Sequence, residues 1–216
     1  MLETRNLEIP RVRIDPVEFK RALDFLDSTP EAPIVLAAMA RDQGAFSYRD
    51  FLVGAAVCTE VGPENAYLTK FPNDAYQTHY AGNFKGVPGP KRPSIDECAE
   101  RKAIIKALME NPKFIFAIYT VSKEMGVDSN EIAQHDILHP CAECREMFRK
   151  LLKEGIMSPA TRMVNVKDNG KFWEKHKGPF DIKEYAKTYT YDKKLVVTVG
   201  EFLEEHIPED VKIVLP

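Results

Sequence analysis

The chain has 216 residues, enough for one large domain or two small ones, and 44% of them are hydrophobic, which is sufficient for a sizeable core. The formal net charge of −3 gives no strong field to attract nucleic acid or an anionic membrane. No apolar run approaches the roughly 20 residues of a membrane helix, and the acidic, apolar-poor start is not typical of a signal peptide. We therefore expect a cytoplasmic protein that does not bind membranes.

Residues 1–32 are expected to form an N-terminal extension, with the main domain at 33–216. Asp15-Pro16 predicts the start of a short helix within the extension. A second helix is expected over 33–43, at the start of the main domain.

A β-hairpin is expected next. Small and branched residues alternate over 51–59 and predict a strand in which Gly54 permits close approach of another backbone. A turn at 62–65 and a second strand at 66–71 would complete the hairpin.

The segment 72–95 is rich in proline and glycine, which predicts a long and functional loop inserted after the hairpin. Lys85, Lys91 and Arg92 lie in it. Two interpretations of these cations stay open: they contact a phosphate of a ligand, or they only solvate the loop.

The rest of the chain alternates helices and strands. Ser94-x-x-Glu97 is the pattern of a capping box and predicts a helix that runs to about Asn111. A strand is expected next at 114–122, followed by a helix from Pro140 to Glu154 and a strand at 162–166. A second insertion at 168–194, a strand at 195–199 and a final helix complete the chain. This alternation predicts a layered α/β domain.

The four cysteines, Cys58, Cys98, Cys141 and Cys144, are too few for a disulfide scaffold and are more typical of free thiols or metal ligands. Cys141 and Cys144 are three residues apart in the first turn of an expected helix, so they share one face and can bind one ion. Cys98, at the start of the other expected helix, can complete a three-sulfur site. Helix N-termini also favour thiolate over thiol.

Three sulfur ligands without an evident fourth protein ligand indicate catalytic rather than structural zinc, since catalytic zinc keeps a position for water. Glu100, two residues after Cys98, could then take a proton from that water and pass it to a leaving amine. Buried core cysteines, or a structural site closed by Cys58, are the alternatives.

The pair Cys98-Ala99-Glu100 and Pro140-Cys141-x-x-Cys144 resembles the zinc-dependent cytidine deaminase family, in the branch that uses three cysteines. Other stretches that resemble the family are Phe51-Leu52-Val53-Gly54-Ala55-Ala56, Cys144-Arg145 and Thr198-Val199-Gly200-Glu201-Phe202-Leu203. The resemblance covers roughly residues 33 to 207, interrupted by the two insertions.

The resemblance implies a three-layer α/β/α sandwich with a mixed central sheet. It also implies zinc-dependent hydrolytic deamination of the 4-amino group of cytidine, deoxycytidine or a closely related cytosine nucleoside, giving the uridine form and ammonia. The implied partner is a small-molecule nucleoside or nucleotide, in a homo-oligomer that is a tetramer or a dimer.

The resemblance further implies roles for residues around the zinc ligands. The backbone N–H of Ala99 would contact the base carbonyl and the backbone carbonyl of His139 the departing amine. Phe51 either stacks on the base or packs in the core, and Asn73 either contacts the sugar or stabilises a turn. Arg145 would withdraw charge from a sulfur ligand.

The family pattern Asn-x-Glu after the second strand is incomplete, because no glutamate lies two residues after Asn73. The sugar pocket is therefore expected to differ. Three alternatives remain: a cytosine nucleotide or nucleoside antibiotic as the substrate, cleavage of a glycosidic bond, and a non-catalytic zinc domain.

Overall fold

The computed structural model describes residues 14–28, 31–47, 52–61, 75–86, 96–122, 140–168, 189–191 and 193–205. Three predicted substrate contacts, Phe51, Asn73 and His139, lie outside the described residues, as does most of the second insertion.

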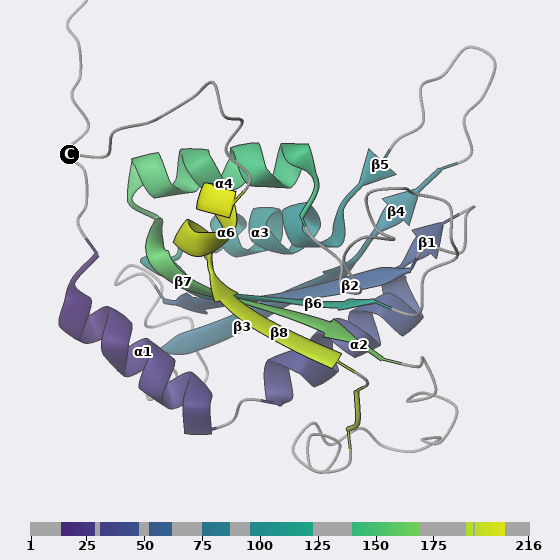
Figure 1. Cartoon of the computed structure of the whole chain (residues 1–216), viewed down its shortest axis with the longest axis horizontal. Coiled ribbons are helices and arrows are strands. Elements are labelled where there is room, and N and C mark those ends of the chain that lie inside the picture. The colour runs from purple at the N-terminus through teal and green to yellow at the C-terminus, as the bar shows by residue number, and fades with distance from the viewer. Residues whose placement is uncertain are drawn as a thin grey trace, which may run out of the picture.

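A mixed five-stranded sheet forms the centre of the fold, in the order β3-β2-β6-β7-β8 (Figure 1). Its strands are β2 (Val53–Glu60), β3 (Tyr76–Gly82), β6 (Phe114–Ser122), β7 (Met157–Lys167) and β8 (Lys193–Thr198). Only β6 and β7 pair in parallel, and the other neighbours are antiparallel. Four of the predicted strands are thereby confirmed, and the strand predicted at 114–122 has the observed bounds.

Helices cover both faces of the sheet (Figure 1). The helices α1 (Pro16–Ser28) and α2 (Ala32–Gly44) lie on one face, and α3 (Ala99–Met109), α4 (Ala142–Glu154) and α6 (Val199–Glu205) lie on the other. Alternation along β2 explains the two layers: Ala56 and Cys58 join the core cluster of α1 and α2, whereas Ala55 and Val57 join that of α3, α4 and α6. The predicted three-layer α/β/α sandwich is confirmed. Within the ranges that the structure describes, no helix is long and apolar enough to cross a membrane.

Gly54 brings α2 into close contact with β2. A Cβ atom at this position would lie 1.8 Å from the carbonyl oxygen of Ala37 on α2. Any side chain larger than hydrogen would therefore push the helix away from the sheet, which confirms the close approach predicted for this glycine.

The N-terminal extension contributes a helix to the core. Asp15 caps α1 as predicted, because its Oδ1 accepts a hydrogen bond of 2.7 Å from the Val17 N–H. Phe19, Ala22 and Leu26 of α1 are buried in the same cluster as α2 and β6. This helix therefore packs on the main domain.

The turn and strand predicted at 62–71 lie outside the described residues, but their predicted pairing with β2 is wrong, because both neighbours of β2 are other strands. The antiparallel neighbour of β2 is β3, whose Tyr76 pairs with Glu60 and whose Gly82 pairs with Gly54. This strand, followed by β4 (Phe84–Lys85), lies inside the segment 72–95 that was interpreted as a loop. The Tyr, Thr and His residues of β3 favour a strand, but the prolines and glycines around them concealed it.

The start of α3 also differs from the prediction. Asp96 and Glu97 form β5, which pairs with Phe84 and Lys85 of β4, so the helix does not begin at the predicted capping box, whose Ser94 lies outside the described residues. The helix instead begins after Cys98, which occupies the N-cap position with φ −67° and ψ 145°. Cys141 is likewise the N-cap of α4, so this helix begins at Ala142, two residues later than the predicted start at Pro140.

A buried ionic network links α2 to the end of β7. Arg41, which is 0% exposed, pairs with Asp42 at 2.7 Å and with Asp168. The Tyr189 hydroxyl donates to the other oxygen of Asp168 at 2.5 Å. Since Arg41 has no access to water, its charge depends on these carboxylates.

Replacing Asp168 with asparagine is expected to destabilise the protein by about 3 kcal/mol or more, because it removes one carboxylate from a buried cation. Urea denaturation of the wild type and the variant measures this difference. Asp24→Asn is the matched control, since Asp24 forms an exposed pair with Lys20 at 2.7 Å, and such pairs contribute about 0.5 kcal/mol or less. Equal losses in the two variants would show that the buried network does not stabilise the fold.

Candidate metal centre and active site

The three predicted zinc ligands lie together at the N-termini of α3 and α4. Cys98 and Cys141 are the N-cap residues of the two helices, and Cys144 lies in the first turn of α4. All three are free, and their Sγ atoms lie within 4.8 Å of one another, with Cys98 and Cys141 3.2 Å apart. We refer to Cys98, Cys141 and Cys144 as the cysteine cluster. The fourth cysteine, Cys58, is buried in the core of the opposite face.

The cysteine cluster fits a tetrahedral zinc ion. Zinc–sulfur bonds of about 2.3 Å at tetrahedral angles place sulfur atoms about 3.8 Å apart, close to the spacing of the cluster. Among the residues that the structure describes, no other His, Cys, Asp or Glu joins this group. The set of three soft donors could therefore hold zinc and leave one position for water, as catalytic sites do.

Hydrogen bonds connect the side chains of the cysteine cluster. The pKa of Cys141 is lowered by hydrogen bonds from the thiols of Cys144 and Cys98, with further bonds from the backbone N–H groups of Cys144 and Glu143. The exposed Cys141 sulfur is thus stabilised as a thiolate at the N-terminus of α4. A cysteine binds a metal ion as the thiolate, so the stabilised thiolate of Cys141 makes the cluster better suited to bind a cation.

Glu100 lies in the first turn of α3, beside the cysteine cluster, and is only 4% exposed. Burial, with a smaller contribution from the negative charge of Cys141, raises the pKa of its carboxyl to about 7. A carboxyl near neutrality can both accept and return a proton. Glu100 is therefore buried in the turn that begins at Cys98, and its role in proton transfer stays a prediction.

Two arginines lie around the cluster. Arg145 Nη1 donates to the carbonyl oxygen of Pro140 at 3.2 Å and so contacts the backbone just before Cys141. Burial alone would lower the pKa of Arg101, but the pair with Glu143 raises it, and negative charge on Cys98 and Cys144 would raise it further. Arg101 therefore lies where it would interact with these two sulfur atoms once they are thiolates, and the sequence interpretation gave it no role.

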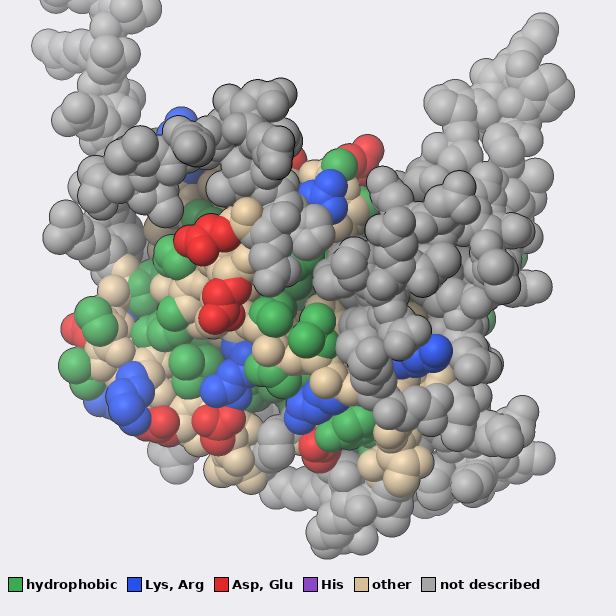
Figure 2. Space-filling view, viewed as in Figure 1, with side chains coloured by type: hydrophobic (Ala, Val, Ile, Leu, Met, Phe, Trp, Pro, Cys, Tyr) green, Lys and Arg blue, Asp and Glu red, His purple; other side chains and the backbone are tan. Residues whose placement is uncertain are grey.

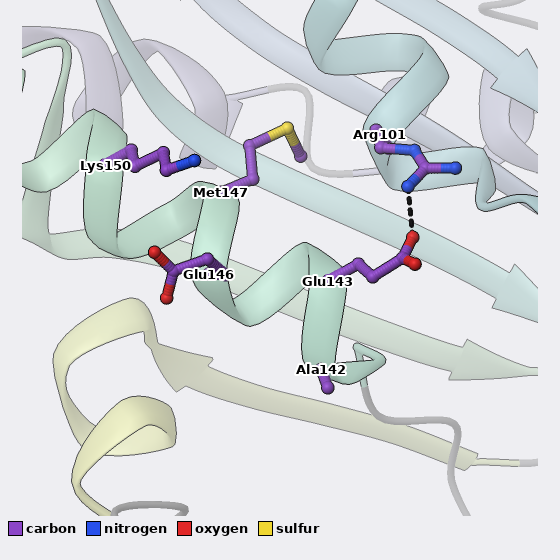
Figure 3. Close-up of a pocket in the computed structure, with 6 residues that line it drawn as sticks. All are labelled: Arg101, Ala142, Glu143, Glu146, Met147 and Lys150. Carbon is purple, nitrogen blue, oxygen red and sulfur yellow. Dashed lines mark hydrogen bonds and ion pairs between the residues drawn. The ribbon is translucent and has the colours of Figure 1, made fainter.

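The ion pair of Arg101 and Glu143 connects the two helices that carry the cysteines. In Figure 3 the guanidinium of Arg101 on α3 points to the carboxylate of Glu143 on α4. The pair lies at one end of an open groove of about 500 Å³ that also contacts Met147 and Lys150. The pair therefore bridges the first turns of the two helices that carry the cysteine cluster.

A small three-stranded sheet leads directly into the cluster. The strands are β1 (Phe46–Ser47), β4 and β5, in the order β1-β4-β5, and β5 ends one residue before Cys98. Phe46 and Phe84 face each other across β1 and β4, with ring centroids 5.4 Å apart. This sheet forms one wall beside the candidate site.

Asn83 follows β3 and was missed because the second strand was predicted too early. It is 2% exposed, and its Oδ1 accepts a hydrogen bond of 2.9 Å from the Val53 N–H. The resemblance expects Asn-x-Glu after the second strand, and the residues that follow β3 are Asn83, Phe84 and Lys85. A lysine therefore stands where that pattern has a glutamate.

Ala99, the first residue of α3, is fully buried. The N–H groups in the first turn of a helix have no partner within the helix, so that of Ala99 is suited to the predicted contact with a base carbonyl.

Charges of both signs are interspersed on the face shown in Figure 2. No patch of one sign dominates the described part of this face.

Solved structures of cytidine deaminases are similar to this chain. The cytidine deaminase from Burkholderia pseudomallei is 20% identical, with 79% of this chain and 93% of that chain covered and a TM-score of 0.47. The cytidine deaminase from Mycobacterium leprae is 21% identical, with 63% and 84% covered and a TM-score of 0.38. That from Mycobacterium tuberculosis is 19% identical, with 60% and 78% covered and a TM-score of 0.38.

No protein-family model and no curated protein sequence matches the chain. Because the likenesses to solved structures are distant, the function has to be inferred from the residues of this chain.

Proposed function

We propose that this protein is a zinc-dependent hydrolase that removes the 4-amino group of cytidine, deoxycytidine or a closely related cytosine compound. One observation carries the proposal: the cysteine cluster and the buried carboxyl of Glu100 meet at the N-termini of α3 and α4. A water molecule activated there would lie next to a carboxyl that can move its protons.

The reaction consumes one water molecule and releases ammonia. A zinc ion held by the cysteine cluster would polarise the water. The water oxygen forms a bond to C4 of the base, the bond from C4 to the amino nitrogen breaks, and the product has a carbonyl at C4. Glu100 accepts one proton from the water and delivers it to N3, and it then takes the second proton from the new hydroxyl on C4 and transfers it to the departing amine.

Charge balance gives Arg101 a role in this mechanism. Three thiolates exceed the charge of a divalent zinc ion by one, which would weaken its activation of water. The guanidinium of Arg101, although it is paired with Glu143, would act on Cys98 and Cys144 as thiolates and would offset part of this excess. Arg145 would position the backbone at Pro140.

Substrate contacts complete the proposal. The Ala99 N–H would contact the base carbonyl, and His139, Phe51 and Asn73 would supply the other contacts that the resemblance implies. The assembly would be a homo-oligomer.

Product analysis tests the proposed function. Zinc-loaded protein is incubated with cytidine, deoxycytidine and their 5′-monophosphates, and the products are separated by chromatography while ammonia is assayed. Uridine products with one ammonia for each molecule converted are expected. Free cytosine without ammonia would instead show glycosidic cleavage, and no product from any of the four would overturn the proposal for these substrates.

A further inference from the structure

The parallel strands β6 and β7 end on the side of the sheet where α3 and α4 begin (Figure 1). Each helix is followed closely by one of these strands: α3 ends at Met109 before β6 begins at Phe114, and α4 ends at Glu154 before β7 begins at Met157. The helices therefore run back along the strands that follow them, and their N-termini lie toward the carboxyl ends of β6 and β7. In α/β sheets, ligands bind in the crevice at such carboxyl ends.

Buried polar side chains replace apolar ones in this part of the sheet. Ile118 of β6 and Met163 of β7 are paired and belong to the core cluster that contains Cys144. Two residues further along each strand, and so on the same face, lie Thr120 and Asn165, which are also paired. These two side chains are 3% and 2% exposed. The face covered by α3 and α4 therefore changes from apolar to polar one row beyond the residues that pack with a predicted zinc ligand.

One hydrogen-bond donor of this pair has no acceptor. The Thr120 hydroxyl donates to Oδ1 of Asn165 and so fixes one end of the amide. Within the part of the chain that the structure describes, the Nδ2 atom at the other end is buried and has no hydrogen-bond partner. A buried amide N–H without an acceptor destabilises a fold, whereas an apolar side chain in the same row would not. Packing therefore does not explain Asn165, and departures of this kind are typical of functional sites.

The row of the sheet around this amide carries no charged side chain. It crosses four strands through Ala55, Thr120, Asn165 and Leu195. An anion at this depth would be buried without a cation beside it, which is unfavourable. The neutral N–H is instead suited to a neutral acceptor, such as a hydroxyl or a carbonyl oxygen.

We propose that the Asn165 amide donates a hydrogen bond to a neutral oxygen of the substrate, either a hydroxyl group of the sugar or the carbonyl group of the base. Thr120 orients the amide, because its bond to Oδ1 leaves the N–H groups for the ligand. This inference rests on the proposed function and adds a substrate-binding residue to it. The fold then retains an unfavourable buried donor because the substrate supplies the acceptor.

The test replaces both polar side chains with apolar ones of similar volume. The double variant Thr120→Val with Asn165→Leu removes the donor and leaves no hydroxyl without a partner. Met163→Leu is the matched control, because Met163 is also buried, on the same strand and the same face, and the exchange conserves volume. For each zinc-loaded protein we would measure the Tm, the Kd for uridine by calorimetry, and kcat/KM for cytidine and its 2′-, 3′- and 5′-deoxy forms.

The double variant is expected to lose affinity without losing stability. Its Tm should equal or exceed that of the wild type, because both partners of the buried bond are replaced together. Its affinity for uridine should fall by about 5- to 100-fold, as expected when an acceptor of the ligand is buried without a donor. Met163→Leu should bind uridine as the wild type does.

The deoxy substrates identify the acceptor. The double variant should lower kcat/KM for every substrate that carries the acceptor and leave it unchanged for the one that lacks it. A loss that is absent with one deoxy form therefore assigns that hydroxyl group. Equal losses with all four substrates assign the carbonyl group of the base.

Failure of this inference is distinguishable from failure of the proposed function. Unchanged affinity and kcat/KM in the double variant would overturn the inference while deamination by the wild type stands. A Tm below that of the wild type, together with weaker binding, would show that the pair stabilises the fold and would also overturn it. If the wild type binds uridine but converts no substrate, the proposed function fails and the calorimetry alone decides the inference. A wild type that neither binds nor converts a nucleoside would overturn both.

Discussion

Replacing Glu100 with glutamine is expected to lower kcat for deamination by about 100- to 10,000-fold, the usual contribution of a positioned general acid–base group. Glutamine has nearly the same shape and fits the buried position, which is 4% exposed. It cannot accept the proton of the attacking water. The loss should therefore fall on kcat rather than on the binding of substrate.

The metal content separates a chemical role of Glu100 from a structural one. Glu100→Gln should bind as much zinc as the wild type, because the cysteine cluster does not include this residue. Glu154→Gln, an exposed substitution at the end of α4, is the matched control and should leave kcat unchanged. Wild-type turnover in Glu100→Gln would remove the proton-transfer role, and with it the mechanism proposed here.

Strong local patterns allowed much of the fold to be predicted. The nearly all apolar run at 114–122 is long enough for a strand and too short for most helices, and its bounds coincide with those of β6. The end of α4 was equally clear, because a glycine follows Glu154. In the structure, Gly155 adopts φ 76°, a conformation that favours glycine. The cysteine cluster was predictable because its spacing places sulfur atoms at two helix starts.

Long-range pairing caused the main error. Residues 66–71 and 76–82 both contain aromatic and β-branched residues, and local pattern alone favoured the segment nearer to β2. The partnership of β2 and β3 depends on a register across the sheet, which no local signal encodes. The misplaced strand also concealed Asn83 and made Lys85 look like part of a loop.

The choice between two arginines shows a second limit. Arg145 and Arg101 both lie about one helical turn after a predicted ligand, four residues after Cys141 and three residues after Cys98. Sequence spacing therefore does not distinguish them. The structure distinguishes them by their partners: Arg145 donates to Pro140, whereas Arg101 interacts with Glu143 and with the charges of two cysteines. The packing of α3 against α4 decides which partners each arginine contacts, and this packing depends on the tertiary fold.

Replacing Cys144 with serine is expected to abolish stable zinc binding. Cys144 is fully buried and supplies one of only three sulfur ligands, and a hydroxyl is a much poorer ligand for zinc than a thiolate. Metal analysis after dialysis should find about one zinc ion per wild-type chain and far less in the variant. Deamination should fall to the background rate in the same preparation.

Cys58→Ala is the matched control, because Cys58 is also buried but lies in the core cluster on the other face of the sheet. It should retain its zinc and its activity. Thermal unfolding adds a measurement that does not depend on turnover: a metal present at 100 times its dissociation constant stabilises a fold by about 2.7 kcal/mol. A chelator should therefore lower the Tm of wild type and Cys58→Ala but leave that of Cys144→Ser unchanged. Equal zinc contents and equal responses to the chelator in all three proteins would show that the cysteine cluster does not hold the metal. The loss of the Cys144 thiolate would then have no effect on zinc binding.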